Sequence, residues 1–94
     1  MSIFSNCKTM EVHWVVESIR PLTKDERAVI LSAKVITSEF GYSLKFLTTE
    51  ETVKIPISNK VSPVVGEFVD INSVKIVTLY KNYNPNEKIY RIEY

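Results

Sequence analysis

The chain has 94 residues, enough for one domain with a small barrel or sandwich core and too few for two domains. It is 45% hydrophobic and 24% charged, which excludes an intrinsically disordered chain. Twelve basic and eleven acidic residues leave a formal charge of +1, without the strongly basic surface of a protein that binds duplex DNA through a broad phosphate footprint.

Residues 1–26 are expected to form an N-terminal extension, in which the stretch around Trp14 fits a strand or a short helix. Trp14 itself is expected in or over the core. The first residues lack the basic start and apolar run of a secretion signal, and no stretch approaches the roughly 20 apolar residues of a membrane span. Cys7 is the only cysteine, so no intramolecular disulfide can form. A reducing, intracellular compartment, cytoplasmic or nuclear, is the simpler interpretation.

Three consecutive strands are predicted next. Residues 27–37 alternate between two faces and are rich in β-branched side chains, which indicates a long strand. After a turn at Gly41, residues 42–48 alternate again, and residues 52–58 follow a polar break. Two short turns make these strands an antiparallel meander. Pro56 cannot donate to a strand ladder, so it should face outward from an edge strand or lie at a bulge.

The second half of the chain predicts an irregular connection and two further strands. Residues 59–67 form a loop or one short helical turn, and residues 68–80 form a long apolar strand. The apolar phase of that strand shifts near Asn72, which predicts a bulge or sharp bend. Residues 81–87 are rich in turn formers and predict a hairpin loop, after which residues 88–94 form the last strand.

This order of five strands, with its one sizeable connection between the third and the fourth, resembles the OB-fold superfold. The resemblance covers about residues 27–94 and includes the turn TSEFGYS and the Gly66 opening before the fourth strand. It implies a single all-β domain over residues 1–94. That domain would be a five-stranded antiparallel barrel with a short N-terminal extension and one short helical turn or loop between strands three and four. SH3-like barrels and a simple sandwich are the alternatives.

The sequence carries no enzyme signature. His13 is the only histidine, so there is no histidine cluster and no Cys/His ligand spacing for a metal. Gly41 and Gly66 are the only glycines and cannot build a phosphate-cradling loop. The carboxylate pairs Asp25-Glu26 and Glu50-Glu51 fall in predicted turns, where charges are usually solvated. We therefore expect no enzyme activity, no catalytic residue, no metal and no cofactor.

The OB-fold resemblance instead implies oligonucleotide binding. Such folds bind across strands two and three and between the loop joining strands one and two and the loop joining strands four and five. Single-stranded nucleic acid needs a cationic track and aromatic rings on which bases stack. A site of this kind would bind DNA or RNA with little sequence specificity, as in a replication or repair accessory factor. The residues predicted for it are Lys34, Phe40, Tyr42, Lys45, Lys54, Lys75, Tyr80, Lys81 and Tyr83.

Two aromatic residues flank the turn at Gly41. Tyr42 shares the phase of Leu44 and Phe46, so it is expected to point inward or to cap the barrel end. Phe40 lies outside that phase and is the better candidate for an exposed, stacking ring.

The alternative function is a protein-interaction module. Ile30, Ile36 and Leu47 are expected on the outer face, and the near-neutral charge suits a protein partner or a second copy of the chain. A homodimer, or a small viral or mobile-element factor that binds and inhibits a host protein, would fit this pattern.

Overall fold

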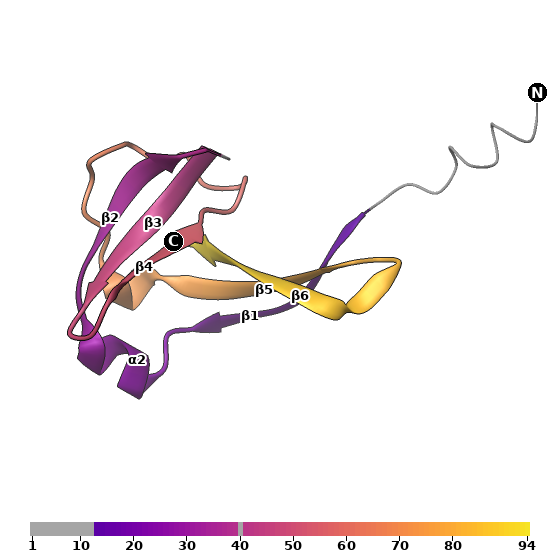
Figure 1. The fold of residues 1–94 in the computed structure, drawn as a ribbon, viewed down its shortest axis with the longest axis horizontal. Coiled ribbons are helices and arrows are strands. Elements are labelled where there is room, and N and C mark those ends of the chain that lie inside the picture. The colour runs from indigo at the N-terminus through magenta and orange to yellow at the C-terminus, as the bar shows by residue number, and fades with distance from the viewer. Residues whose placement is uncertain (1–12, 40) are drawn as a thin grey trace, which may run out of the picture.

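The protein is built from two antiparallel three-stranded sheets, β1-β5-β6 and β2-β3-β4, in a computed structural model that describes residues 13–39 and 41–94 (Figure 1). The elements in chain order are β1 (Trp14–Pro21), α2 (Lys24–Val29), β2 (Ile30–Ser38), β3 (Gly41–Thr48), β4 (Thr52–Pro56), η1 (Ile71–Ser73), β5 (Lys75–Lys81) and β6 (Asn84–Glu93). The predicted all-β class is confirmed.

The sheet β2-β3-β4 is the predicted meander. Gly41 takes φ +118°, a backbone conformation that favours glycine, and this allows the tight reversal between β2 and β3. β4 is the last strand of this sheet and Pro56 is exposed at its end, so the prediction for this proline is confirmed.

The predicted first strand starts three residues late because residues 24–29 form the short helix α2. A capping box begins this helix: the Thr23 hydroxyl accepts from the Glu26 amide at 3.2 Å, and the Thr23 amide donates to the Glu26 carboxylate at 2.8 Å. The pattern Thr-x-x-Glu is a known helix-start signal, so it could have been recognised in the sequence.

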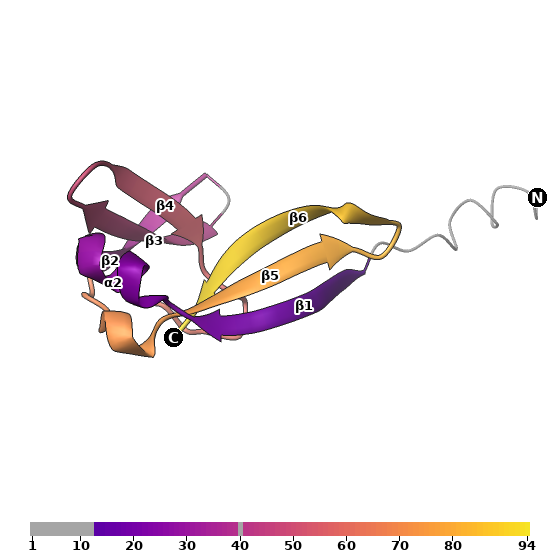
Figure 2. The ribbon, with the colours of Figure 1, turned by 90° about the horizontal axis from the view of Figure 1, so that it is seen from below.

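The sheet β1-β5-β6 projects from the rest of the molecule, and we call it the arm (Figures 1 and 2). β1 lies within the predicted extension and pairs antiparallel with β5, from Trp14 opposite Lys81 to Pro21 opposite Lys75. The predicted final hairpin is present, but its turn contracts to residues 82–83 and β6 begins at Asn84. Trp14 is 45% exposed and is not among the residues packed in or against the core, so its expected place in or over the core is wrong.

One short bridge links the two sheets, and a second links the segment between β4 and β5 to β2. Ile57, just after β4, forms a parallel bridge with Ile92 of β6, and the Ser58 amide donates to the Ile92 carbonyl at 2.7 Å. Residues 66–69 run antiparallel along the free edge of β2, with Phe68 opposite Lys34. The described residues form six strands and no closed barrel, so the predicted five-stranded barrel is not confirmed.

Residues 66–69 cover part of the β2 edge through three backbone hydrogen bonds. The Gly66 amide donates to the Val35 carbonyl at 2.9 Å, the Val35 amide to the Glu67 carbonyl at 2.9 Å, and the Val69 amide to the Ala33 carbonyl at 2.8 Å. The strand predicted over residues 68–80 is interrupted by the turn η1, at the place where the apolar phase shifts.

The core lies where the sheets meet. It combines side chains from β2 and β3 with others from β5, β6 and the connecting segments. Its buried members are Leu22, Ala33, Val35, Leu44, Phe46, Ile57, Val74, Ile76 and Ile92. The outer face of β2-β3-β4, opposite this core, is mostly exposed, although Ser43 on that face is buried.

Candidate nucleic-acid interface

Three of the predicted lysines form one row across the outer face of the β2-β3-β4 sheet. Lys34 lies directly opposite Lys45, and Lys45 lies directly opposite Lys54. All three side chains are exposed. Because directly opposed residues in antiparallel strands have Cβ atoms about 5 Å apart, the three ammonium groups occupy one short band of surface. We call this set the lysine row.

No acidic residue lies among the rows that flank the lysine row. On one side the paired residues are Ser32, Leu47 and Thr52, and on the other they are Ile36, Ser43 and Pro56. Within the described residues, none of the three lysines makes an ion pair; the ion pairs found there are Arg20–Glu26 and Lys88–Glu17. Directly opposed like charges destabilise a sheet. The lysine row therefore lowers the stability of the sheet, and a bound anion would relieve this repulsion.

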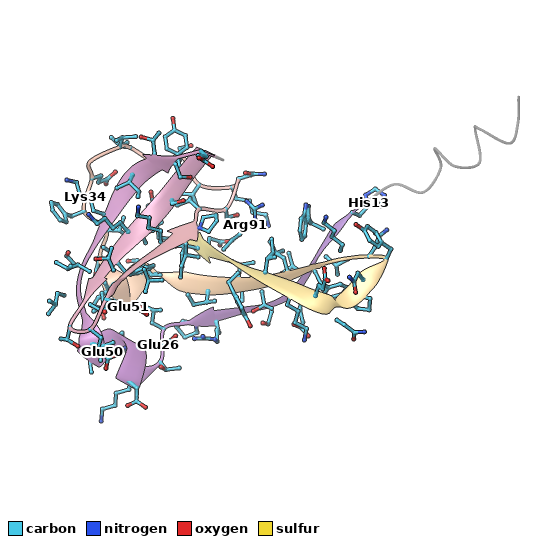
Figure 3. All side chains as sticks on the ribbon, in the orientation of Figure 1. His13, Glu26, Lys34, Glu50, Glu51 and Arg91 are labelled. Atoms are coloured by element: carbon cyan, nitrogen blue, oxygen red, sulfur yellow. The ribbon has the colours of Figure 1, made fainter. Side chains whose placement is uncertain are left out.

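An exposed aromatic ring extends the lysine row at one end. The Lys34 ammonium lies 5.6 Å from the centroid of the Phe68 ring, and Phe68 is 67% exposed. Figure 3 shows Lys34 on the side of β2 that faces away from the arm. The sequence pattern assigned Phe68 to the start of a strand, so it was missed as a site residue. Only the pairing of residues 66–69 with β2 brings its ring beside Lys34.

A cleft of about 610 Å³ continues the surface at the other end, between the edge of β4 and the arm. Lys54, Arg20 and Tyr90 line it. Arg20 donates twice to the Glu26 carboxylate, at 2.8 and 3.3 Å, and this bond is the main reason why the pKa of Glu26 falls to about 2. Arg20 is thus neutralised by its partner. Lys54 and Tyr90, which is 54% exposed, remain available to contact a ligand in this cleft.

The other predicted residues lie away from the lysine row. At the far end of the arm, the Lys81 ammonium lies 5.4 Å from the Trp14 ring centroid and 5.8 Å from that of Tyr83. Tyr80 is half-buried on β5, and Lys75 lies at the start of that strand, opposite Pro21. The predicted set therefore separates into a sheet group and an arm group.

The aromatic pair at the Gly41 turn is only partly described. Tyr42 shares the inward phase of Leu44 and Phe46, which are buried, but it lies near the strand end and is 46% exposed. Tyr42 is therefore not buried with them, and the alternative that it caps the end of the sheet stays a prediction. Phe40 lies outside the described residues. Leu47 is 45% exposed, as expected for the outer face.

The described part of the chain contains no group of three or more His, Cys, Asp or Glu side chains placed to hold a metal ion. None of its helices is long and apolar enough to cross a membrane. No protein-family model matches the sequence, and comparison with curated proteins and with solved structures finds no significant similarity.

Proposed function

We propose that the protein binds single-stranded DNA or RNA, with little sequence specificity, across the outer face of the β2-β3-β4 sheet. The observation that carries the proposal is the register that places Lys34, Lys45 and Lys54 in one row beside the exposed ring of Phe68. The lysines would contact successive phosphates, and Phe68 would offer a base a face on which to stack.

The two parts of the site supply different parts of the affinity. Three phosphate contacts to a single strand give log K a slope of about −2 against the logarithm of salt concentration. A stacked ring adds about 1–3 kcal/mol and discriminates little between bases, because every base has a π-face. Low specificity and strong salt dependence follow from this composition.

Two isolated bridges support an open form of the OB-like arrangement. To close a meander with a following hairpin into a five-stranded barrel, β6 must reach β4 and the fourth-strand segment must reach β2. The parallel bridge Ile57–Ile92 and the antiparallel bridge Lys34–Phe68 are contacts of these two kinds. In this proposal residues 66–69 and β5 are two halves of one barrel strand, interrupted by η1. β1 is then an additional strand on the hairpin.

The proposal is tested by fluorescence anisotropy with labelled mixed-sequence oligonucleotides, at several salt concentrations between about 50 and 200 mM. Lys45→Gln removes the central charge of the lysine row, and Lys24→Gln is the matched control on α2. We expect Lys45→Gln to weaken binding and to reduce the salt slope by about 0.7, whereas Lys24→Gln changes neither. Absence of binding at low salt, or equal losses in both variants, would refute the proposal.

The ring of Phe68 is tested separately from the charges. Phe68→Leu keeps an apolar side chain without the π-face, and Phe68→Tyr keeps the ring. We expect Phe68→Leu to lose about 1–2 kcal/mol of binding free energy at an unchanged salt slope, and Phe68→Tyr to bind like the parent protein. Equal affinities for the parent protein and both variants would show that Phe68 does not contact the oligonucleotide.

The arm favours a second candidate function, self-association. β1 is an edge strand, and on one face it carries Trp14, Val16 and Ile19, which are 45–48% exposed. Pairing of β1 with β1 would extend the arm into a six-stranded sheet.

Sedimentation at increasing protein concentration tests this second candidate. We expect a dimer that Val16→Lys dissociates, while Val64→Lys, at an exposed position outside the arm, leaves it intact. A monomer at every concentration would contradict self-association through the arm.

A further inference from the structure

A pocket of about 280 Å³ lies where the end of β4 meets β6, next to the Gly41 turn. Arg91, Tyr42 and Asn59 are among the side chains that line it, together with apolar groups such as Val61 and Pro63. Figure 3 shows Arg91 beside the end of β4. The pocket is distinct from the lysine row, although Pro56, which lines it, follows Lys54 by two residues along the same strand.

Arg91 is a half-buried cation with no anionic partner in the described part of the chain. It projects from β6, opposite Val77, and none of the described residues that line the pocket is acidic. Within the described residues it makes no ion pair, because the ion pairs found there involve other side chains. An arginine cannot shed its proton in a protein. A half-buried arginine in a pocket whose described lining holds no acidic side chain therefore favours an anionic ligand.

The remaining lining indicates what the anion is attached to. Tyr42 offers a ring that is 46% exposed, and Val61 and Pro63 add apolar surface. The volume of about 280 Å³ lies just below the usual range for ligand pockets, about 300–1,000 Å³, so it suits one nucleotide rather than several along a strand. A planar guanidinium binds two phosphate oxygens at once. An aromatic face beside it suits a base.

We propose that this pocket holds the terminal nucleotide of a single strand, with its phosphomonoester on Arg91 and its base against Tyr42. This inference rests on the proposed function and adds the end of the strand to it. A terminal phosphomonoester carries a charge of about −1.5 to −2, more than an internal phosphodiester, so Arg91 favours an end over the middle of a strand. Pro56 and Lys54 lie about 7 Å apart along β4, so the strand could pass from the lysine row to the pocket.

The test compares oligonucleotides of one sequence that carry a 5′-phosphate, a 3′-phosphate or only hydroxyl ends. We expect one of the two phosphates to tighten binding about tenfold, as for hydrogen bonds to a charged group. Arg91→Gln should abolish that preference and leave the affinity for hydroxyl ends within about twofold. Arg91→Lys keeps the charge without the planar fork and should retain part of the preference. Thermal unfolding of each variant establishes that it is folded.

Two results would overturn the inference: equal affinity for all three ends in the parent protein, or a preference that survives Arg91→Gln. If Arg91→Gln does not fold, the parent protein and Tyr42→Ala test the inference instead. Tyr42→Ala should weaken binding of the phosphorylated oligonucleotide more than binding of the oligonucleotide with hydroxyl ends. An equal loss for both ends would also overturn it.

Titration with a deoxynucleoside monophosphate, followed by NMR, separates this inference from the proposed function. Shifts of the Arg91 and Tyr42 side-chain signals, without any oligonucleotide binding, would support nucleotide binding in the pocket and refute oligonucleotide binding by the lysine row. Salt-dependent oligonucleotide binding that does not depend on the end group would support the lysine row and refute the terminal-nucleotide pocket.

Discussion

Lys45 should reduce the stability of the protein and increase its affinity for a polyanion at the same time. It is directly opposite Lys34 on one neighbouring strand and Lys54 on the other. Each directly opposed like-charge pair costs about 0.2–1 kcal/mol. Lys45→Gln removes both pairs, so the free energy of unfolding should rise by about 0.5–1 kcal/mol.

The same substitution removes one phosphate contact. With a coefficient of about 0.7 per contact, its loss lowers log K by about 0.7 at 0.1 M salt, which is about fivefold in affinity. Lys45→Glu should go further in both directions, because it replaces two repulsive pairs with two attractive ones and repels phosphate. A functional lysine row thus predicts changes of opposite sign in stability and in binding.

Urea unfolding followed by circular dichroism measures the first quantity, and oligonucleotide anisotropy measures the second. Both are run on the parent protein, on Lys45→Gln and on the control Lys24→Gln. A loss of stability in Lys45→Gln would show that the lysine side chain contributes more by packing than it costs in repulsion. Unchanged binding would show that the row does not meet the ligand. Either result refutes the reasoning.

Three further substitutions test features away from the lysine row. The pKa of Glu26 is about 2, against an ordinary 4.5, chiefly because of the hydrogen bond from Arg20, so the stability it confers is present above pH 4.5 and is lost as the pH falls toward 2. Since the Glu26 side chain is 39% exposed, solvent screening reduces this contribution to stability to about 1 kcal/mol. Glu26→Gln should therefore lower the free energy of unfolding by about 1 kcal/mol at neutral pH and make stability depend less on pH below pH 4.5. Within the described residues the buried Tyr94 hydroxyl has no hydrogen-bond partner, so Tyr94→Phe should raise the free energy of unfolding by about 1 kcal/mol; a fall would reveal a partner in solution. Gly66 has φ +90°, so Gly66→Ala should cost about 1 kcal/mol or more although its methyl group would meet open space, and an unchanged urea midpoint would contradict this.

The sequence predicts best the elements whose partners are close along the chain. Alternation located the strands of the meander, because each pairs with the next across a short turn. It could not locate β1, whose partner β5 lies at the other end of the chain and whose side chains are exposed on both faces. Alternation carries little information for such a strand.

The candidate site was predictable in part for the same reason. Alternation placed Lys34, Lys45 and Lys54 on the outer face, but only the register of the two turns makes them direct neighbours. A change of one residue in either turn would have moved a lysine out of the row. Phe68 and Arg91 could not be assigned from the sequence, because each gains its neighbours through contacts between segments far apart in the chain.

The pairing of β1 with β5 also sets an order of events during synthesis. Trp14 pairs with Lys81, 67 residues later, so β1 cannot be fully paired until Lys81 has been synthesised. The meander can form as soon as its own residues emerge. Closing so long a loop is entropically costly, and contacts of high sequence separation slow folding. β1 is therefore made before the meander but pairs with β5 only after it, and until then its apolar side chains are accessible to other chains. Slow refolding that becomes concentration-dependent is the kinetic signature expected of this topology.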